Sequence, residues 1–207
     1  MMFQIRNATH DDLPQLLELE NVWPEDTRAT EHDLNLRINA FPAGYFVAES
    51  DLGIIGSMIA HPYVYNPYDL SNFKSWEKVN QACAIQRIPF DGCNALYLLS
   101  GTNTAHGYAK ALFIQALERA LDLAKKIGKS YIVAGIILPG YARFISKHGL
   151  ITPENYVFKQ SNGRCVDPYI ERFRQLGFHV PTKEHVIANY FPDKNSLNYS
   201  ALVVKSL

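Results

Sequence analysis

One stretch in the middle of the chain constrains its fold more than any other. Residues 94–99 and 131–137 are short and almost continuously apolar, which predicts two buried strands. Between them, residues 108–126 carry apolar side chains at helical spacing, and Gly128 follows as a typical helix end. A strand, a helix and a strand in this order make two parallel strands joined by a crossover helix. The chain is therefore predicted to be an α/β protein.

The sequence on either side adds strands and helices to this unit. Further strands are expected at residues 3–6, 45–49 and 53–59. Two helices are expected to begin at capping boxes, formed by Thr9 with Asp12 and by Thr30 with Asp33. The remaining predictions are helices at 75–84, 152–163 and 167–175 and closing strands at 178–180 and 201–204.

The length allows one large domain or two small ones. The chain has 207 residues, and neither a repeat nor a low-complexity linker divides it. We therefore predict one domain over residues 1–207. Long segments rich in aromatic and polar residues interrupt the regular pattern at about 63–92 and 139–166, and these are expected to be insertions that carry function.

Charge and composition exclude several classes of protein. Lys plus Arg and Asp plus Glu both number 20, and this +0 net charge argues against a nucleic-acid partner. The three cysteines and seven histidines show no metal-ligand spacing, and the apolar run 131–138 is far too short to span a membrane. The first residues do not form a secretory signal. We predict a cytoplasmic protein that binds neither a metal ion nor a membrane.

The loop between the first parallel strand and the crossover helix is the best candidate for a binding site. Small residues fill positions 101–107, so the loop amides and the first helical turn can converge on one space. Gly107 would let a phosphate approach the backbone closely. The loop alone is compatible with two readings, a pyrophosphate-binding loop and an ordinary strand–helix connection that contains a glycine.

This loop resembles the acyl-CoA motif of the GCN5-related N-acetyltransferase (GNAT) superfamily, Q/R-x-x-G-x-G/A. Residues 104–109 read TAHGYA, so Gly107 and Ala109 match the motif, whereas Thr104 replaces the usual Gln or Arg. The predicted order of elements also matches over essentially the whole chain. The resemblance implies a mixed, mostly antiparallel sheet of about seven strands, with a central, splayed parallel pair and helices on both faces.

Several short segments resemble one branch of this superfamily, the GNAT domains joined to nitrilase-like amidohydrolases. These segments are 73–79, 92–97, 138–141, 167–168, 177–178 and 189–193. No hydrolase domain is present in the chain, and the substrates of that branch do not identify the acceptor.

The resemblance implies that acetyl-CoA is bound as a co-substrate. The predicted binding residues are Leu98, Leu99, Ser100, Thr104, Ala105, His106, Gly107, Tyr108, Ala109 and Lys110. The acceptor would be a small-molecule or peptide amine, and a homodimer is compatible with the family. The predicted acceptor-site residues are Trp23, Tyr65, Trp76 and Tyr190, with Tyr68 as a further lid candidate.

The predicted reaction is direct transfer of an acetyl group from acetyl-CoA to an amine. In many family members a tyrosine protonates the leaving thiol, but Phe173 occupies that position here, and Tyr169 and Tyr141 are the alternative acids. Glu18, Glu20 or Glu25 could remove the amine proton through water. The absence of the usual tyrosine keeps open a second reading, a non-catalytic acyl-CoA-binding module that regulates or recruits a partner such as a separate hydrolase. Transfer of a longer acyl chain is a third.

Overall fold

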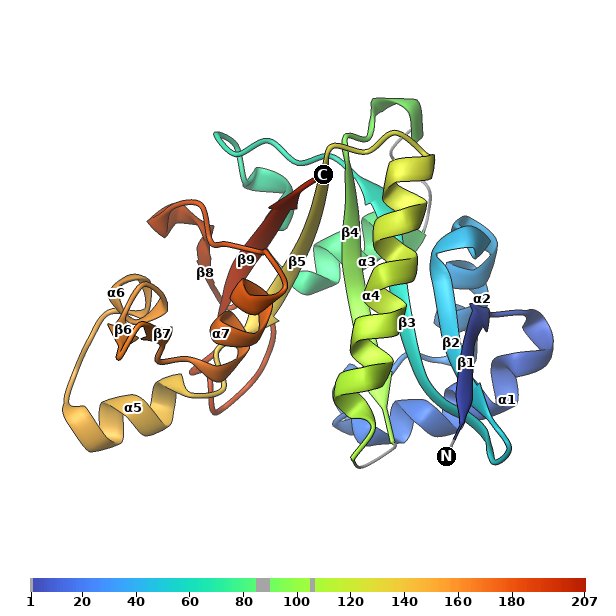
Figure 1. Ribbon diagram of the computed structural model, residues 1–207, viewed down its shortest axis with the longest axis horizontal. Coiled ribbons are helices and arrows are strands. Elements are labelled where there is room, and N and C mark those ends of the chain that lie inside the picture. Colours follow the sequence, from blue (N-terminus) through green and yellow to red (C-terminus); the bar gives the residue numbers. More distant parts are fainter. Residues whose placement is uncertain (1, 85–89, 105–106) are drawn as a thin grey trace.

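The computed structural model describes residues 2–84, 90–104 and 107–207 (Figure 1). Its main feature is a seven-stranded sheet in which only the pair β4–β5 is parallel. In spatial order the strands are β1 (Phe3–Asn7), β2 (Tyr45–Ser50), β3 (Gly53–Tyr63), β4 (Ala95–Asn103), β5 (Tyr131–Ile137), β9 (Tyr199–Ser206) and β8 (Val186–Ala188). The predicted fold class is confirmed.

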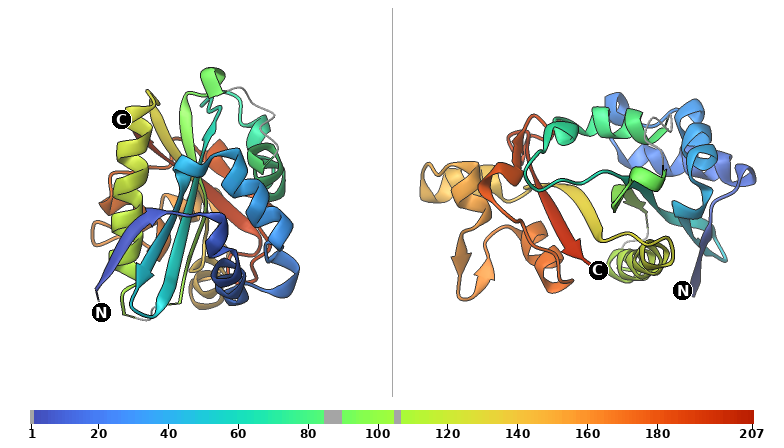
Figure 2. Two further views of the ribbon diagram at one scale, coloured as in Figure 1. Left: turned by 90° about the vertical axis from the view of Figure 1, so that its right-hand side faces the viewer. Right: turned by 90° about the horizontal axis from the view of Figure 1, so that it is seen from above.

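Helices cover both faces of the sheet, as the left view of Figure 2 shows. One face carries α4 (Ala109–Lys126), α5 (Tyr141–His148), α6 (Pro153–Val157) and α7 (Pro168–Gln175). The other carries α1 (Leu13–Leu19), α2 (Glu31–Ala40) and α3 (Trp76–Ala84). Alternate residues of β4 serve the two layers, because Leu96 and Leu98 pack toward α4 whereas Tyr97 and Leu99 pack toward α1–α3. No helix in the described ranges is long and apolar enough to cross a membrane.

The two parallel strands separate partway along their length. Their pairing runs from Ala95 opposite Tyr131 to Leu98 opposite Ala134 and then stops, although both strands continue. Figure 1 shows β4 and β5 side by side at one end and well apart at the other. The predicted splayed pair is therefore present, and it opens at the carboxyl ends of the strands.

In the second half of the chain, one helix was not predicted and two predicted elements are wrong. Residues 141–148 form the helix α5, which was not predicted. The helix that begins at Thr152 ends at Val157, and Asn162 and Gly163 turn a small hairpin, β6 (Gln160–Ser161) with β7 (Arg164–Cys165). Their φ angles of 51° and 74° are those of a left-handed turn, which the Asn-Gly pair favours. Residues 178–180 make only an isolated bridge from His179 to Val204, and β8 is the edge strand instead.

Burial of His61 on β3 should make the stability of the fold depend on pH. Its Nδ1 lies 2.9 Å from the Pro62 carbonyl oxygen, its Nε2 has no partner among the described residues, and the rings of Phe41 and Phe90 pack against it. Burial lowers the pKa of His61 below the ordinary value of 6.5. The unfolded chain therefore binds a proton at pH values where the folded chain does not, and stability falls as the pH drops below about 6.5.

We expect His61→Leu to reduce that loss of stability. One proton corresponds to a slope of about 1.4 kcal/mol per pH unit in the free energy of unfolding. Urea unfolding between pH 7.5 and pH 5 would measure the slope in the wild type and the variant. The exposed His32 provides the control substitution His32→Leu, and equal slopes in the wild type and His61→Leu would contradict the expectation.

Candidate active site

A cavity of about 310 Å³ occupies the gap between β4 and β5 and extends under α2 and α3. At the sheet, its walls come from the ends of the two strands and from the first turn of α4. On the far side they come from the segment after α1, from α2, α3 and α7, and from the loop after β8. The lining residues are Glu20, Trp23, Thr27, Arg37, Met58, Trp76, Leu98–Gly101, Asn103, Ala109, Phe113, Ala134–Ile137, Tyr169, Arg172, Phe173, Tyr190 and Phe191.

A β-bulge at Leu99 shapes the opening between the strands. On β3, Ile59 pairs with Ser100 and the next residue, Ala60, pairs with Leu98, so Leu99 is an extra residue in β4. The pairing with β5 has already ended at Leu98. The Leu99 carbonyl accepts a hydrogen bond of 2.9 Å from the Trp76 indole instead. Bulges commonly redirect the backbone next to active sites, and this one ties the strand to the helix that covers the cavity.

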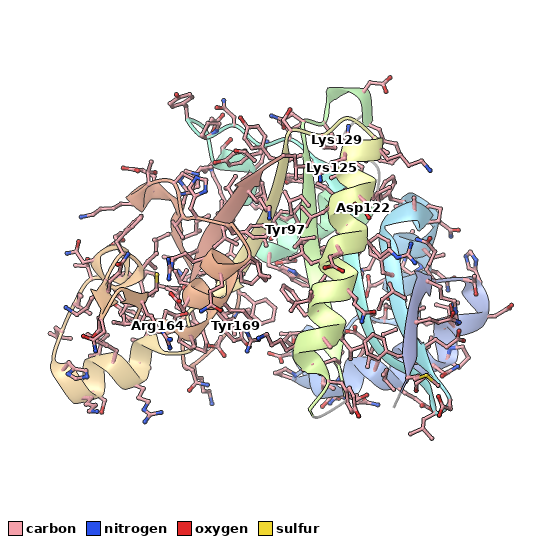
Figure 3. The ribbon with its side chains drawn as sticks, in the orientation of Figure 1. Tyr97, Asp122, Lys125, Lys129, Arg164 and Tyr169 are labelled. Atoms are coloured by element: carbon pink, nitrogen blue, oxygen red, sulfur yellow. The ribbon has the colours of Figure 1, made fainter. Side chains whose placement is uncertain are left out.

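Two buried tyrosines form the inner end of the opening. The Tyr97 hydroxyl accepts a hydrogen bond of 3.0 Å from the Gly135 amide and is hydrogen-bonded to the Tyr190 hydroxyl. Figure 3 shows Tyr97 between β4 and β5. Burial raises the pKa of both phenols, so both stay protonated at neutral pH. Gly135 has no side chain, which leaves room for the Tyr190 ring beside its backbone.

The predicted phosphate-binding loop lies at the other end of the cavity. Helix α4 begins at Ala109, which lines the cavity, and Gly107 precedes it with a φ of +90° and open space where a Cβ would point. The side chains of Tyr108 and Lys110, which follow Gly107 in the sequence, are exposed. The amide and hydroxyl of Thr104 both point to the Ile55 carbonyl oxygen, at 3.0 and 3.4 Å. Ala105 and His106 lie outside the described residues.

An aromatic wall closes the side of the cavity farthest from α4. The Phe191 ring makes edge contacts with Trp23 and Trp76, at centroid distances of 6.1 and 5.6 Å. The Trp23 indole donates to the Thr102 hydroxyl at 2.9 Å. The Trp76 amide donates to the Tyr190 carbonyl oxygen at 2.8 Å, and this bond fastens the loop after β8 to α3. The cavity thus brings together three of the predicted acceptor residues: Trp23, Trp76 and Tyr190.

Helix α7 contributes Tyr169, one of the two predicted proton donors. The buried carboxylate of Asp167 caps this helix, accepts from the Tyr169 and Ile170 amides, and also binds the Gly140 amide and the Tyr156 hydroxyl. Burial raises the pKa of Asp167. Tyr169 lies on the side of α7 that faces α4 (Figure 3) and is 37% exposed. Phe173, one turn later, also lines the cavity but has no proton to give.

The structure does not bring three of the predicted aromatic residues to the cavity. The Tyr141 hydroxyl donates to the Ile151 carbonyl oxygen at 2.7 Å, so this side chain is part of the core around α5 and α6. The Tyr65 hydroxyl is 2.9 Å from Nε2 of His185, in the core on the α1–α3 side of the sheet. Tyr68 is 96% exposed. Neither Tyr141 nor Tyr65 lines the cavity.

Several residues of the cavity were not predicted from the sequence. Arg37 falls between Leu34 and Ile38 on the buried face of α2, and a cation on an apolar stripe was a signal that could have identified it. Phe191 follows the predicted Tyr190, whereas Phe113 and Arg172 lie at helix positions that the pattern does not distinguish from others. No group of three or more His, Cys, Asp or Glu side chains that could hold a metal ion occurs in the described parts of the chain.

Comparison with known proteins supports the predicted resemblance. No protein-family model matches the chain. The chain is 27% identical over 208 residues to the "Uncharacterized N-acetyltransferase YkwB" of Bacillus subtilis (strain 168), which covers 96% of this chain and 86% of that protein. It is 24% identical over 201 residues to the "Probable hydrolase YhcX" of the same organism, covering 96% of this chain but only 37% of that protein. The nitrilase-linked branch remains a prediction.

Solved structures share the whole fold. The loading GNATL domain of CurA from Lyngbya majuscula matches with a TM-score of 0.78 and 19% identity, covering 100% of this chain and 98% of that one. The GphF GNAT-like decarboxylase in complex with isobutyryl-CoA matches with a TM-score of 0.75 and 22% identity, covering 98% of each chain.

A third structure, yncA from Salmonella typhimurium, a putative acetyltransferase with its cofactor acetyl-CoA, has a TM-score of 0.59 and 16% identity over 99% of this chain and 94% of that one. The chain therefore has the fold of the GNAT superfamily, and the resemblance to that superfamily predicted from its sequence is confirmed.

Proposed function

We propose that the protein is an acyl-CoA-dependent N-acyltransferase that transfers acetyl from acetyl-CoA to an amine. The observation that carries the proposal is the single cavity that begins in the gap between β4 and β5 and ends at the wall of Trp23, Trp76 and Phe191. Such a cavity can hold the thioester end of one substrate against a second substrate. The acetyltransferase YkwB and the CoA complexes of the same fold support this assignment.

The loop before α4 is proposed to hold the pyrophosphate of acetyl-CoA. The positive φ of Gly107 and the open space beside it fit a phosphate group, and the first amides of α4 would supply donors and the positive end of the helix dipole. Acetyl-CoA would supply the acetyl group as a thioester. The loop would therefore fix the direction in which the thioester enters the gap.

Backbone donors at the bulge are proposed to stabilise the reaction. Attack by an amine places negative charge on the thioester oxygen, and fixed N–H donors at that position are typically worth several kcal/mol. Leu98 ends the parallel pairing and Leu99 is bulged, so the backbone of Leu98–Ser100 faces the gap without the next β5 residues as partners. This is the segment from which we expect the donors.

Tyr169 is the proposed acid that protonates the leaving thiolate. It lines the cavity and is partly exposed, whereas the Tyr190 hydroxyl is already hydrogen-bonded to Tyr97. Glu20 lines the same cavity and is proposed to accept the amine proton through water. With these assignments, the residue that protonates the thiolate and the residue that accepts the amine proton both line the cavity.

Replacing Tyr169 with Phe tests the acid and the function together. We expect Tyr169→Phe to lower kcat about 100-fold and to leave the KM for acetyl-CoA unchanged, because only the proton of the hydroxyl is lost. Thiol release in the presence of a panel of amines would measure both constants. Tyr141→Phe is the matched control, since that hydroxyl is bound to Ile151 away from the cavity, and it should keep full turnover.

The same assay separates enzyme from binding module. Equal turnover of Tyr169→Phe and wild type would remove Tyr169 from the mechanism. Acetyl-CoA binding without thiol release for any amine would contradict the transferase and favour the non-catalytic acyl-CoA-binding module.

A second candidate function is decarboxylation of an acyl-CoA that carries a carboxylate. Two arginines, Arg37 and Arg172, line the cavity, and the fold matches the GphF GNAT-like decarboxylase more closely than the acetyltransferase yncA. Release of carbon dioxide from an acyl-CoA that carries its carboxylate on the α-carbon, where the thioester carbonyl can accept the electron pair and the resulting enolate is then protonated, would support this alternative if no amine is present, and its absence would exclude it.

A further inference from the structure

Arg37 is a buried cation that no carboxylate in the described parts of the chain neutralises by contact. The side chain is 5% exposed, and its guanidinium lies 6.0 Å from the centroid of the Trp76 ring. Its Nη2 donates to the Asn80 side-chain oxygen at 3.1 Å, while its Nε has no hydrogen-bond partner among the described residues. Within these residues, no carboxylate oxygen lies within 4.0 Å of the guanidinium.

Asp33, whose charge interacts with that of Arg37, and Glu20, which lines the same cavity, have other partners. The Asp33 carboxylate, one turn earlier on α2, accepts from the amide and hydroxyl of Thr30 at 2.9 and 2.7 Å. Its charge interacts with the charge of Arg37 at a distance, and the two groups make no ion-pair contact. The Glu20 carboxylate accepts from the Ala29 amide at 2.8 Å. Arg37 therefore reaches the wall of the cavity with no carboxylate in contact among the described residues, and its buried Nε–H has no partner there either.

A buried guanidinium of this kind reduces the stability of the fold unless an anion binds to it. Buried charges in proteins are normally paired, and an unpaired buried N–H costs free energy. Guanidinium groups bind carboxylates especially well because their planar array of N–H donors matches the two carboxylate oxygens. Arg37 lies on α2 beside Trp76, at the acceptor end of the cavity rather than at the strand gap.

We propose that Arg37 binds a carboxylate of the acceptor, and that the acceptor is therefore a small amino acid-like molecule rather than a simple amine. The proposal rests on the proposed transferase function and names the class of its second substrate. Glu20, which is 8% exposed and lines the same cavity, supplies the opposite charge for the ammonium group that must lose a proton before attack. Trp23, Trp76 and Phe191 would pack against the remainder of the molecule.

Matched pairs of acceptors test this proposal. We expect the wild type to use free amino acids with a kcat/KM about 10- to 100-fold higher than that of the same amino acids as primary amides. Arg37→Gln should abolish this difference and leave the KM for acetyl-CoA unchanged. Arg143→Gln, an exposed substitution on α5, is the control and should keep the preference. The same acid-to-amide ratio in wild type and Arg37→Gln would overturn the proposal.

Two further measurements keep the test decisive. If Arg37→Gln does not fold, the wild type alone still tests the proposal. A ratio of one between its kcat/KM for amino acids and for the corresponding amides would overturn it. If no amine causes thiol release, the proposed transferase function is wrong. Calorimetry would then still compare the affinity of the wild type and of Arg37→Lys for amino acids, and so test the carboxylate site by itself. A variant that weakens binding of a carboxyacyl-CoA but not of amino acids would place the carboxylate on the acyl donor and overturn the assignment to the acceptor.

Discussion

Gly107→Glu is expected to raise the Kd for acetyl-CoA and for CoA at least 100-fold. Gly107 lies two residues before the start of α4 with a φ of +90°, in the loop that we propose as the phosphate cradle. A glutamate would place bulk in the space beside the backbone and a negative charge against the phosphates, which the helix dipole otherwise attracts. Calorimetric titration with both ligands would measure the effect.

Gly149→Glu is the matched control for this substitution. Gly149 ends α5, has a φ of +88°, and also has open space beside its Cα. Both variants therefore carry the same added charge and place a side chain at a positive φ that favours glycine. Normal affinity in Gly107→Glu would show that the phosphates bind elsewhere, and equal loss in both variants would show a nonspecific effect of charge.

The parts of the fold predicted from sequence are those with strong local signals. The parallel pair followed from two uninterrupted apolar runs with an amphipathic helix between them. The capping box of Thr30 and Asp33 marked the start of α2, and both of its reciprocal hydrogen bonds are present. Such signals depend only on residues close in sequence, so they survive without knowledge of the tertiary structure.

The elements that were missed carry weaker or misinterpreted signals. Helix α5 has apolar residues at Tyr141, Phe144 and Ile145, the spacing of one helical face, but it is only eight residues long and follows Pro139-Gly140. That pair was interpreted as the start of an irregular insertion. The Asn162-Gly163 turn was interpreted as a helix end, although the same dipeptide is typical of a two-residue hairpin.

The composition of the cavity depends on contacts between distant segments. Tyr190 and Phe191 reach α3 because the Trp76 amide binds the Tyr190 carbonyl oxygen, across more than one hundred positions in the chain. The sequence does not distinguish Tyr65 and Tyr141 from the aromatic residues that line the cavity. In the structure, however, each of their hydroxyl groups has a partner in the core. Sequence therefore identified aromatic candidates, and only the tertiary structure separated the lining residues from the core.

Gly135→Ala is expected to destabilise the protein by about 3 kcal/mol and to disrupt the acceptor end of the cavity. A Cβ on Gly135 would lie 2.4 Å from Cε1 of Tyr190 and 2.8 Å from the Tyr97 hydroxyl oxygen. Overpacking of this kind typically costs 1–3 kcal/mol, and loss of the buried hydroxyl pair adds to it. Displacement of Tyr190 would also move Phe191 away from Trp76. Urea unfolding and amine KM values would measure the two effects.

Gly92→Ala supplies the control, because no atom of the described residues lies within 4 Å of a Cβ at Gly92, and its free energy of unfolding should stay close to that of the wild type. A double variant tests the cause. If the contact with Tyr190 is responsible, Tyr190→Val should reduce the cost of Gly135→Ala, leaving only the part due to the Tyr97 hydroxyl, so the two substitutions would be non-additive. Additive losses would show that Gly135 is required for a reason other than the Tyr190 ring. Because Tyr97 and Tyr190 meet where β4 and β5 separate, a positive coupling would show that their packing against Gly135 holds the opening in shape.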